Sequence, residues 1–385
     1  MTDDTFEDVD WSETGGRLWW LGTARARAVM ATAVGYIGLF IYDYVARGDR
    51  PTIPFLSWEA SQLDWLFILA LLALLFGLIW PLARNRRLTA AYWREFRQNR
   101  PAVLGLGFLI AIFLIGLIGP ILTSPPELAV TRSYQPPVGF SVDASLPSSC
   151  VGAVIDGQCH GTMAHPFGTT QRGRDVLKYI VFGMRVSMQI GLIGALIVIS
   201  IGTLVGTVSA YAGGMVDEVL MRYVDVQQTF PVFFLYLLIN FLFDINLFLL
   251  ILVFSLFSWG GIARLVRSEA LQRSEEAYVR AADGAGASTA YIVRRHLIPN
   301  VSGTVITVAT LTIPGLLLFE AGLSFLELGT GAFSWGEVIA AGRENLTQAW
   351  WVSTIPGFFL FFTILAFNYL GDALRDALDP REVLT

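Results

Sequence analysis

Long apolar segments alternate with shorter polar ones along this chain, a pattern typical of a protein that crosses a membrane repeatedly. A helix needs about 20 apolar residues to span the roughly 30 Å of hydrocarbon in a bilayer. Segments near this length predict eight membrane-spanning helices, at about 28–45, 65–82, 102–122, 186–210, 231–243, 247–265, 301–326 and 351–370. The segment at 231–243 is the shortest of them, so the pattern defines its ends least sharply.

Two arginine-rich stretches set the predicted orientation. Residues 83–101 carry six Arg and one acid, Glu95, and residues 264–299 carry six more Arg. Basic loops that adjoin membrane spans stay in the cytoplasm. Eight spans place both stretches on one side of the membrane, so we expect both termini in the cytoplasm. The Pro-rich loop at 123–174 is then outside, as an extended, turn-rich segment.

Composition narrows the class of protein. The 385 residues are 54% hydrophobic and 15% charged, whereas soluble domains are roughly one quarter charged, so a soluble globule is excluded. The net charge of -5 argues against a nucleic-acid partner, because neutralising phosphates requires a basic face. Two Cys are too few for a disulfide scaffold. We therefore predict an all-α, polytopic membrane protein whose surroundings are the lipid membrane.

The second arginine-rich stretch contains a short predicted surface helix. Ser274 is a suitable N-cap, Gly286 permits the helix to end, and Ser288 can cap the next one. A small apolar stripe would be formed by Tyr278, Ala281, Ala282 and Ala285, flanked by Arg280 and Asp283. The stripe could rest on lipid headgroups or fit a groove of another protein. It lacks the Trp, Phe and Leu that anchor interfacial helices, which favours a protein partner.

This stretch resembles the "EAA" loop of binding-protein-dependent ABC importer permeases. Ala281, Ala282, Gly286 and Pro299 occupy motif positions, whereas Arg280 stands where many members have Glu. The resemblance extends over residues 164–381 and is strongest to the dipeptide/oligopeptide branch, the C-type subunit. Segments that carry it include His165-Pro-Phe-Gly-Thr, Gly173-Arg-Asp, Tyr211-Ala-Gly-Gly and Glu320-Ala-Gly-Leu-Ser-Phe-Leu.

The resemblance implies a type I ABC importer permease core of six transmembrane helices. Its parts would be a first core helix at 101–122, an extracytoplasmic loop and lead-in at 123–183, and the remaining core at 184–385, with a coupling loop at 264–299. Residues 1–100 would be an extension with two extra spans. The residues implied to contact an ATPase subunit are Tyr278, Arg280, Ala281, Ala282, Asp283, Gly286 and Pro299.

The same resemblance implies partners and function. The chain would pair with a second permease, as a heterodimer, and would work with two ATP-binding subunits and an extracytoplasmic substrate-binding protein in the cell membrane. The cargo would be dipeptides or oligopeptides, with a metal complex as the alternative. The chain lacks a Gly-x-x-x-x-Gly-Lys-Ser/Thr phosphate loop, so we expect no enzymatic activity and no cofactor here, with ATP and Mg bound by the partners.

Two other classes of membrane protein remain open from the residues alone. An ion-coupled carrier would need intramembrane carboxylates at a broken helix and repeat symmetry, and the sequence shows isolated acids and no clear repeat. An intramembrane enzyme would need a nucleophile and a base in one cavity, and three His offer little for such a pair.

A few polar residues invite a specific role. Glu320 and Asn240 lie in or near predicted spans and would serve the pathway or the architecture. Cys150 and Cys159 lie together in the outside loop and favour a disulfide over a metal site. Glu327 occupies a position where the family usually has Gly, so we expect an altered turn there.

Overall fold

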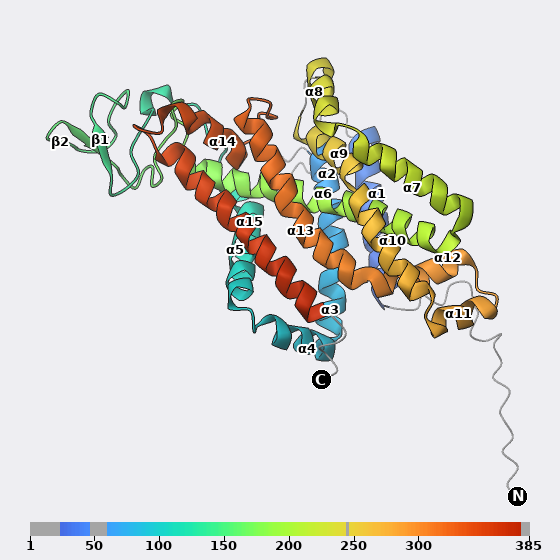
Figure 1. The fold of residues 1–385 in the computed structure, drawn as a ribbon. Coiled ribbons are helices and arrows are strands. Elements are labelled where there is room, and N and C mark those ends of the chain that lie inside the picture. Colours follow the sequence, from blue (N-terminus) through green and yellow to red (C-terminus); the bar gives the residue numbers. More distant parts are fainter. Residues whose placement is uncertain (1–23, 47–59, 244–245, 379–385) are drawn as a thin grey trace, which may run out of the picture. The chain divides into compact units, whose positions relative to one another are not determined.

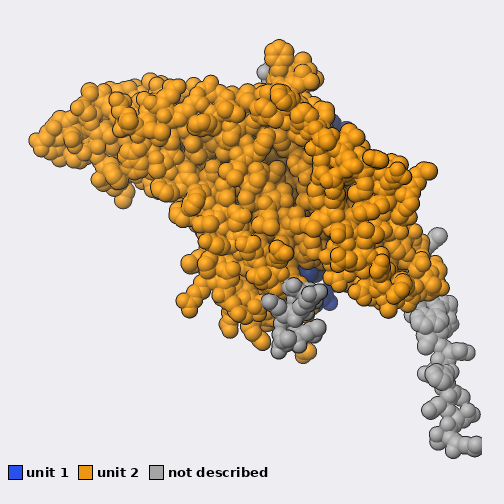
Figure 2. Space-filling view, in the orientation of Figure 1, with its two compact units in different colours: residues 1–85 blue, residues 86–385 orange. Residues whose placement is uncertain are grey.

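The computed structural model describes residues 24–46, 60–243 and 246–378. The chain forms two compact units, Met1–Asn85 and Arg86–Thr385, which are coloured separately in Figure 2. Asp244, expected at a membrane edge, lies outside the described residues. The predicted boundary at residue 100 differs from this division because the helix that follows Asn85 packs within the second unit.

The first unit contains two long apolar helical segments. One is α1 (Ala24–Ile41), which continues in the π-helical turn η2 (Tyr42–Ala46). The other joins α2 (Gln62–Leu74), η4 (Leu75–Ile79) and α3 (Trp80–Arg84). Ser61 and Asp64 form a capping box that starts α2. Both segments are long and apolar enough to span a membrane, as the pattern predicts.

Two part-buried hydrogen bonds join the two segments of the first unit. The Trp65 indole Nε1 donates a hydrogen bond to Asp43 at 3.0 Å, and the Tyr36 hydroxyl donates to the Trp65 carbonyl at 3.0 Å. These bonds satisfy polar groups that would be costly within lipid. They hold the C-terminal part of α1 and η2 beside the start of α2.

The second unit is predominantly helical. Its α-helices are α4 (Arg86–Phe96), α5 (Arg100–Leu122), α6 (Val176–Ala212), α7 (Gly214–Thr229), α8 (Val232–Phe243), α9 (Leu247–Ser258), α10 (Gly260–Ser274), α11 (Ala277–Gly284), α12 (Thr289–Ile292), α13 (Ile298–Phe325), α14 (Trp335–Gly342) and α15 (Trp351–Leu378). Three single turns are η5 (Val130–Arg132), η6 (Val293–Leu297) and η7 (Arg343–Asn345). Over both units and within the described ranges, seven helical segments could each span a membrane, or up to eight if the bent pair α7 and α8 is one span.

The long helix α6 is central in the second unit and packs against α5, α10 and α13 (Figure 1). Gly202 and Gly206 permit its close contact with α10. A Cβ atom at Gly202 would lie 2.8 Å from Ile262 Cγ2, and one at Gly206 would lie 2.5 Å from the Ala263 carbonyl oxygen. These two small residues therefore let the backbones of α6 and α10 approach each other closely.

The shortest predicted span is one arm of a broken helix. The chain bends by 68° between α7 and α8, at Phe230 and Pro231. Pro231 cannot donate a backbone hydrogen bond to the preceding turn, which explains the break. The two arms together supply the length that 231–243 alone lacks.

The loop before α6 differs from the extended segment that the sequence predicts. It contains a three-stranded antiparallel sheet in the order β1–β3–β2, made of β1 (Ser141–Asp143), β2 (Val154–Ile155) and β3 (Gln158–His160). The strands are too short to produce a recognisable alternation. Figure 1 shows the sheet at one end of the second unit, and α11 and α12 at the other.

Both arginine-rich stretches of the second unit lie away from the sheet. The start of α15 lies at the sheet end, where Trp351 Nε1 donates to the Thr169 carbonyl at 3.1 Å. At its other end, Ala373 and Ala377 of α15 bury Phe96 of α4. Helix α4 therefore lies with the C-terminal part of α15, away from the sheet, as α11 does in Figure 1.

Candidate functional site

The segment between α10 and α13 forms a compact helical corner. Ser274 does not cap α11 as the sequence suggests. Its hydroxyl donates instead to the Leu271 carbonyl at 2.7 Å and so helps to end α10, and α11 begins after Glu276. Ser288 caps α12 as predicted, because its Oγ accepts from the Tyr291 amide at 3.3 Å.

A glycine turn fixes the end of α11. Gly286 has a φ of +81°, the left-handed conformation that favours glycine. The Ala287 amide donates to the Ala282 carbonyl at 3.1 Å, and the Gly286 amide donates to the Asp283 carbonyl at 2.8 Å. This pair of bonds is the Schellman motif, so Gly286 is required by the backbone of the loop itself.

A buried cluster supports α11 from beneath. Val279 lies in it with Ile292, Val293 and Leu297, all almost fully buried. Ala282 is half-buried and packs against the same cluster, so of the predicted stripe only Tyr278, Ala281 and Ala285 are exposed.

The opposite face of α11 is open. We call it the docking face, and it consists of Ala277, Tyr278, Arg280, Ala281, Gly284 and Ala285, all exposed. A Cβ atom at Gly284 would meet nothing within 4 Å. Most of these residues are Ala or Gly, and the helix is supported by the buried cluster. The docking face is therefore a shallow surface that a complementary groove can approach closely.

Side chains at the edge of the corner tie it to the membrane helices. Tyr211, at the end of α6, donates its hydroxyl hydrogen to Asp283 Oδ1 at 3.0 Å. His296 lies between the rings of Tyr278 and Tyr291, 5.8 Å from each centroid. The contacts of Tyr211 and Tyr291 are not predicted from the sequence, although Tyr211 begins one of the family-like segments. Pro299 lies in the first turn of α13 and is exposed.

Ion pairs join the helices behind this corner. Arg267 of α10 donates from Nε and Nη2 to both carboxylate oxygens of Asp217 in α7, at 2.6 and 2.5 Å, and Ser209 of α6 bonds the same carboxylate. Arg264 also pairs with Asp225 of α7. A displacement of α11 can thus be transmitted through α10 and α6 to α7, one arm of the broken helix.

The two polar residues expected in the spans lie in different surroundings. Glu320 is buried in α13, where its Oε1 accepts from the Ser324 hydroxyl at 2.9 Å, next to the start of α14. Asn240 is half-buried on the short arm α8. The structure does not bring these two side chains into one site.

Two polar features lie in the loop before α6. Cys150 and Cys159 are joined by a disulfide beside β3. His165 Nδ1 lies 2.7 Å from Asp175 Oδ2, at the N-cap of α6. Among the residues that the structure describes, no three potential metal ligands lie together.

Comparison with known proteins identifies two matching regions. Residues 199–383 match the family described as "Binding-protein-dependent transport system inner membrane component". Residues 87–137 match the "N-terminal TM domain of oligopeptide transport permease C". The second match begins at residue 87, so the part of the chain with counterparts in known permeases begins earlier than the predicted residue 101.

This chain aligns with most of the length of several known permeases. The chain is 41% identical over 220 residues to the oligopeptide transport system permease protein OppC of Haemophilus influenzae, covering 57% of this chain and 71% of that protein. It is 36% identical over 292 residues to the dipeptide transport system permease protein DppC of Bacillus subtilis, covering 75% and 84%. It is 35% identical over 292 residues to OppC of Escherichia coli, covering 75% and 90%.

Proposed function

Since this chain belongs to the family of inner membrane components of binding-protein-dependent transport systems, we propose that it forms one half of a pathway for short peptides. It is a multi-pass permease subunit of an ATP-driven transporter and is not an enzyme. It works with ATPase and substrate-binding subunits. In the proposed assembly a second, different permease completes the pathway and two ATP-binding subunits carry ATP and Mg.

Peptides are the cargo that the relatives' names support. The three relatives reported above are named for oligopeptide or dipeptide transport. They share 35–41% identity with this chain over 220–292 residues. We therefore assign peptides, rather than a metal complex, to this transporter.

The docking face of α11 is the observation that carries the coupling part of the proposal. Its exposed side chains stand on the buried Val279 cluster, and the Tyr211–Asp283 bond links the helix to α6. Closure of the ATPase subunits would push this face and tilt α6 and α10, which switches the pathway between its two openings. In this orientation α11 and both termini are cytoplasmic, and the small sheet is outside.

Uptake by the reconstituted assembly tests the proposal. The chain, its second permease and the ATP-binding subunits are inserted in proteoliposomes, with the binding protein and a labelled oligopeptide outside and MgATP inside. We expect accumulation of peptide with MgATP and none with a non-hydrolysable analogue. Accumulation driven by a proton or sodium gradient without ATP would contradict the proposal and support an ion-coupled carrier.

A further inference from the structure

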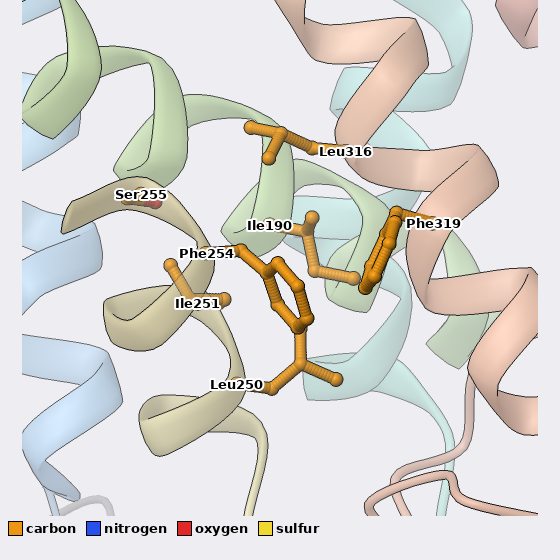
Figure 3. Close-up of a pocket in the computed structure, with 7 residues that line it drawn as sticks. All are labelled: Ile190, Leu250, Ile251, Phe254, Ser255, Leu316 and Phe319. Atoms are coloured by element: carbon orange, nitrogen blue, oxygen red, sulfur yellow. The ribbon is translucent and has the colours of Figure 1, made fainter. Parts of the chain in front are cut away.

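A groove of about 580 Å³ lies beside the small sheet, at the end of the second unit away from the docking face. One wall follows residues 140–143 and the turn after them, and the other follows the segment from Thr347 to Trp351. The size suits a small ligand, since such sites usually hold about 300–1,000 Å³. A second pocket, between α6, α9 and α13, is much smaller and its lining is almost entirely apolar (Figure 3).

The groove runs along the edge of β1, not across the face of the sheet. Its wall includes four consecutive residues, 140–143. The face of a strand would contribute every second side chain, whereas its edge presents the backbone of each residue in turn. The sheet order β1–β3–β2 leaves one side of β1 without a neighbouring strand.

The hydrogen-bond pattern shows which backbone groups face the groove. The Phe140 carbonyl accepts from Gly161, and the Ala144 amide donates to Gly157. Bonded positions alternate in an antiparallel pair, so Val142 bonds β3, and the N–H and C=O groups of Ser141 point away from it. The Asp143 amide points the same way. A second extended chain could pair with these free groups.

One end of this edge is closed and acidic. The Asp143 carbonyl already accepts from the Leu146 amide at 3.0 Å, so the free edge stops there. The Asp143 side chain is exposed, and its Oδ1 accepts from the Ser145 amide and hydroxyl at 2.9 and 2.6 Å. These two donors hold the pKa of the Asp143 carboxyl below its usual range, so the group is charged at neutral pH.

The other end of the edge is aromatic. The Phe140 ring meets the Trp350 ring edge to face, with centroids 5.1 Å apart. Phe140 is exposed and Trp350 is half-buried, so both retain apolar surface toward the groove. Thr347 and Gln348 add polar groups on the opposite wall.

We propose that this groove binds a transported peptide in extended form, antiparallel to β1, with its free N-terminal ammonium beside Asp143. The second or third side chain of the peptide then lies near Phe140 and Trp350. Backbone pairing requires no particular peptide sequence, which suits a carrier of varied peptides. This inference rests on the peptide cargo of the proposed function and gives that cargo a site on this chain.

The short, closed edge favours a free peptide over a strand of the binding protein. Only Ser141 and Asp143 offer outward groups, so the edge holds about three residues of a partner. A strand inside a folded protein continues at both ends and has no ammonium to place at Asp143. A short peptide matches both the length and the charge.

Photo-crosslinking to the assembled transporter in nanodiscs, without binding protein, tests the site. The probe is a tripeptide with a free N-terminus and a diazirine side chain at its third residue. We expect crosslinks within 140–146 or 347–351, and weaker labelling of an N-acetylated probe. Asp143→Asn should weaken binding of the free peptide about two- to fivefold, the range for an exposed charge pair.

A proline scan separates backbone pairing from general damage to the sheet. Ser141→Pro removes an outward N–H without removing a bond to β3, and should abolish labelling at the groove. The matched variant is Val154→Pro on β2, whose N–H also points outward but on the opposite edge, because the neighbouring Ala153 bonds His160. Asp156→Asn, in the turn between β2 and β3, controls for loss of charge.

The outcomes distinguish this inference from the proposed function. Crosslinking needs no transport, so it is scored separately from ATP-dependent uptake. Uptake of peptide by an assembly that shows no labelling at 140–146 or 347–351 would overturn the groove and leave the proposed function standing. Loss of binding-protein association in Ser141→Pro, with peptide labelling unchanged, would assign the edge to the binding protein and also overturn the inference.

Discussion

Tyr211 and Asp283 are separated by 72 positions in the sequence and are joined by one hydrogen bond of 3.0 Å. Tyr211 is in the last turn of α6, the long central helix of the second unit, and Asp283 is in the last turn of α11. The bond is therefore a direct link between α11, the helix that carries the docking face, and the centre of the permease. Movement of α11 can be passed to α6 without passing through the intervening helices.

Tyr211→Phe should loosen this link and leave the fold intact. The ring remains to pack on the cluster around Val279, and only the hydroxyl is lost. A hydrogen bond contributes about 0.5–1.5 kcal/mol net, so we expect peptide uptake per ATP hydrolysed to fall about twofold to tenfold. Uptake and hydrolysis are measured together in proteoliposomes. Tyr223→Phe, on α7, is the control, and an unchanged ratio in Tyr211→Phe would show that the bond plays no part in coupling.

Gly284→Leu should block the approach of an ATPase subunit. Gly284 is helical and open, so Leu fits the chain itself and improves helix propensity. If a groove closes over the docking face, the added side chain costs about 1–3 kcal/mol of overpacking and weakens association about fivefold or more. Pull-down of the ATPase subunits from detergent measures this. Gly284→Ala is the matched variant with a small effect, and full association of Gly284→Leu would place the interface elsewhere.

Gly286 is a poorer probe of the same contact, for a reason visible only in the structure. Its φ of +81° strains any other L-residue apart from the partial tolerance of Asn and Asp, so Gly286→Asp changes the turn and the surface together. Both effects should reduce coupling. The variant cannot separate them, whereas Gly284 can.

The sequence predicts the membrane helices well because apolar length is a local property. Each predicted span overlaps a helix of the structure, and the weakest one, 231–243, is the arm that needs α7 to complete it. The inward turn of Ala282 was not predictable from α11 alone. It depends on Ile292 and Leu297, which a glycine turn brings beneath the helix.

The small sheet shows a second limit of the pattern. Its strands have two or three residues each, and turns of Ser, Gly and Pro surround them. Alternation cannot be recognised over so few positions. The paired cysteines are the one feature that predicts a closed loop there, and they give no indication of the free edge of β1.

Glu327 tests the cost of a left-handed residue at a helix end. Its φ is +63°. The Leu328 and Glu327 amides donate hydrogen bonds to carbonyls at the end of α13, in the same arrangement that ends α11 at Gly286. The expected altered turn is thus an ordinary cap with Glu in the glycine position. Arg343 pairs with the Glu327 carboxylate and also donates to the Phe325 carbonyl at 2.5 Å.

Glu327→Gly should leave stability unchanged or raise it slightly. Glycine relieves about 1–2 kcal/mol of backbone strain, and an exposed ion pair contributes at most about 1 kcal/mol. Glu327→Val should lower the midpoint of thermal unfolding in detergent, since a β-branched residue tolerates this φ poorly. Glu327→Gln isolates the ion pair. A clear loss of stability in Glu327→Gly would mean that Arg343 contributes more than the strain costs.

Glu320→Gln distinguishes an architectural role from a pathway role. The amide oxygen of Gln can still accept the Ser324 hydroxyl, so we expect peptide uptake close to that of the wild type. Glu320→Leu removes the acceptor from a buried site and should destabilise the protein by about 1–3 kcal/mol. Uptake at several peptide concentrations and thermal unfolding are measured for both. A rise in KM with unchanged stability in Glu320→Gln would indicate contact with the peptide.

The pH dependence of peptide binding follows from the charges that meet at Asp143. Asp143 is the one titratable side chain among the lining residues of the groove, and its lowered pKa keeps it charged well below neutral pH. The α-amino group of a peptide loses its proton near pH 7.7–8.0. The affinity for a free tripeptide should therefore be constant from about pH 5 to 7 and fall as the pH rises through the amine pKa.

Two controls should show no such fall in affinity: an N-acetylated tripeptide with the wild-type protein, and the free tripeptide with the Asp143→Asn variant. Tighter binding of the free peptide at pH 9 than at pH 6 would mean that its ammonium is not held at this carboxylate.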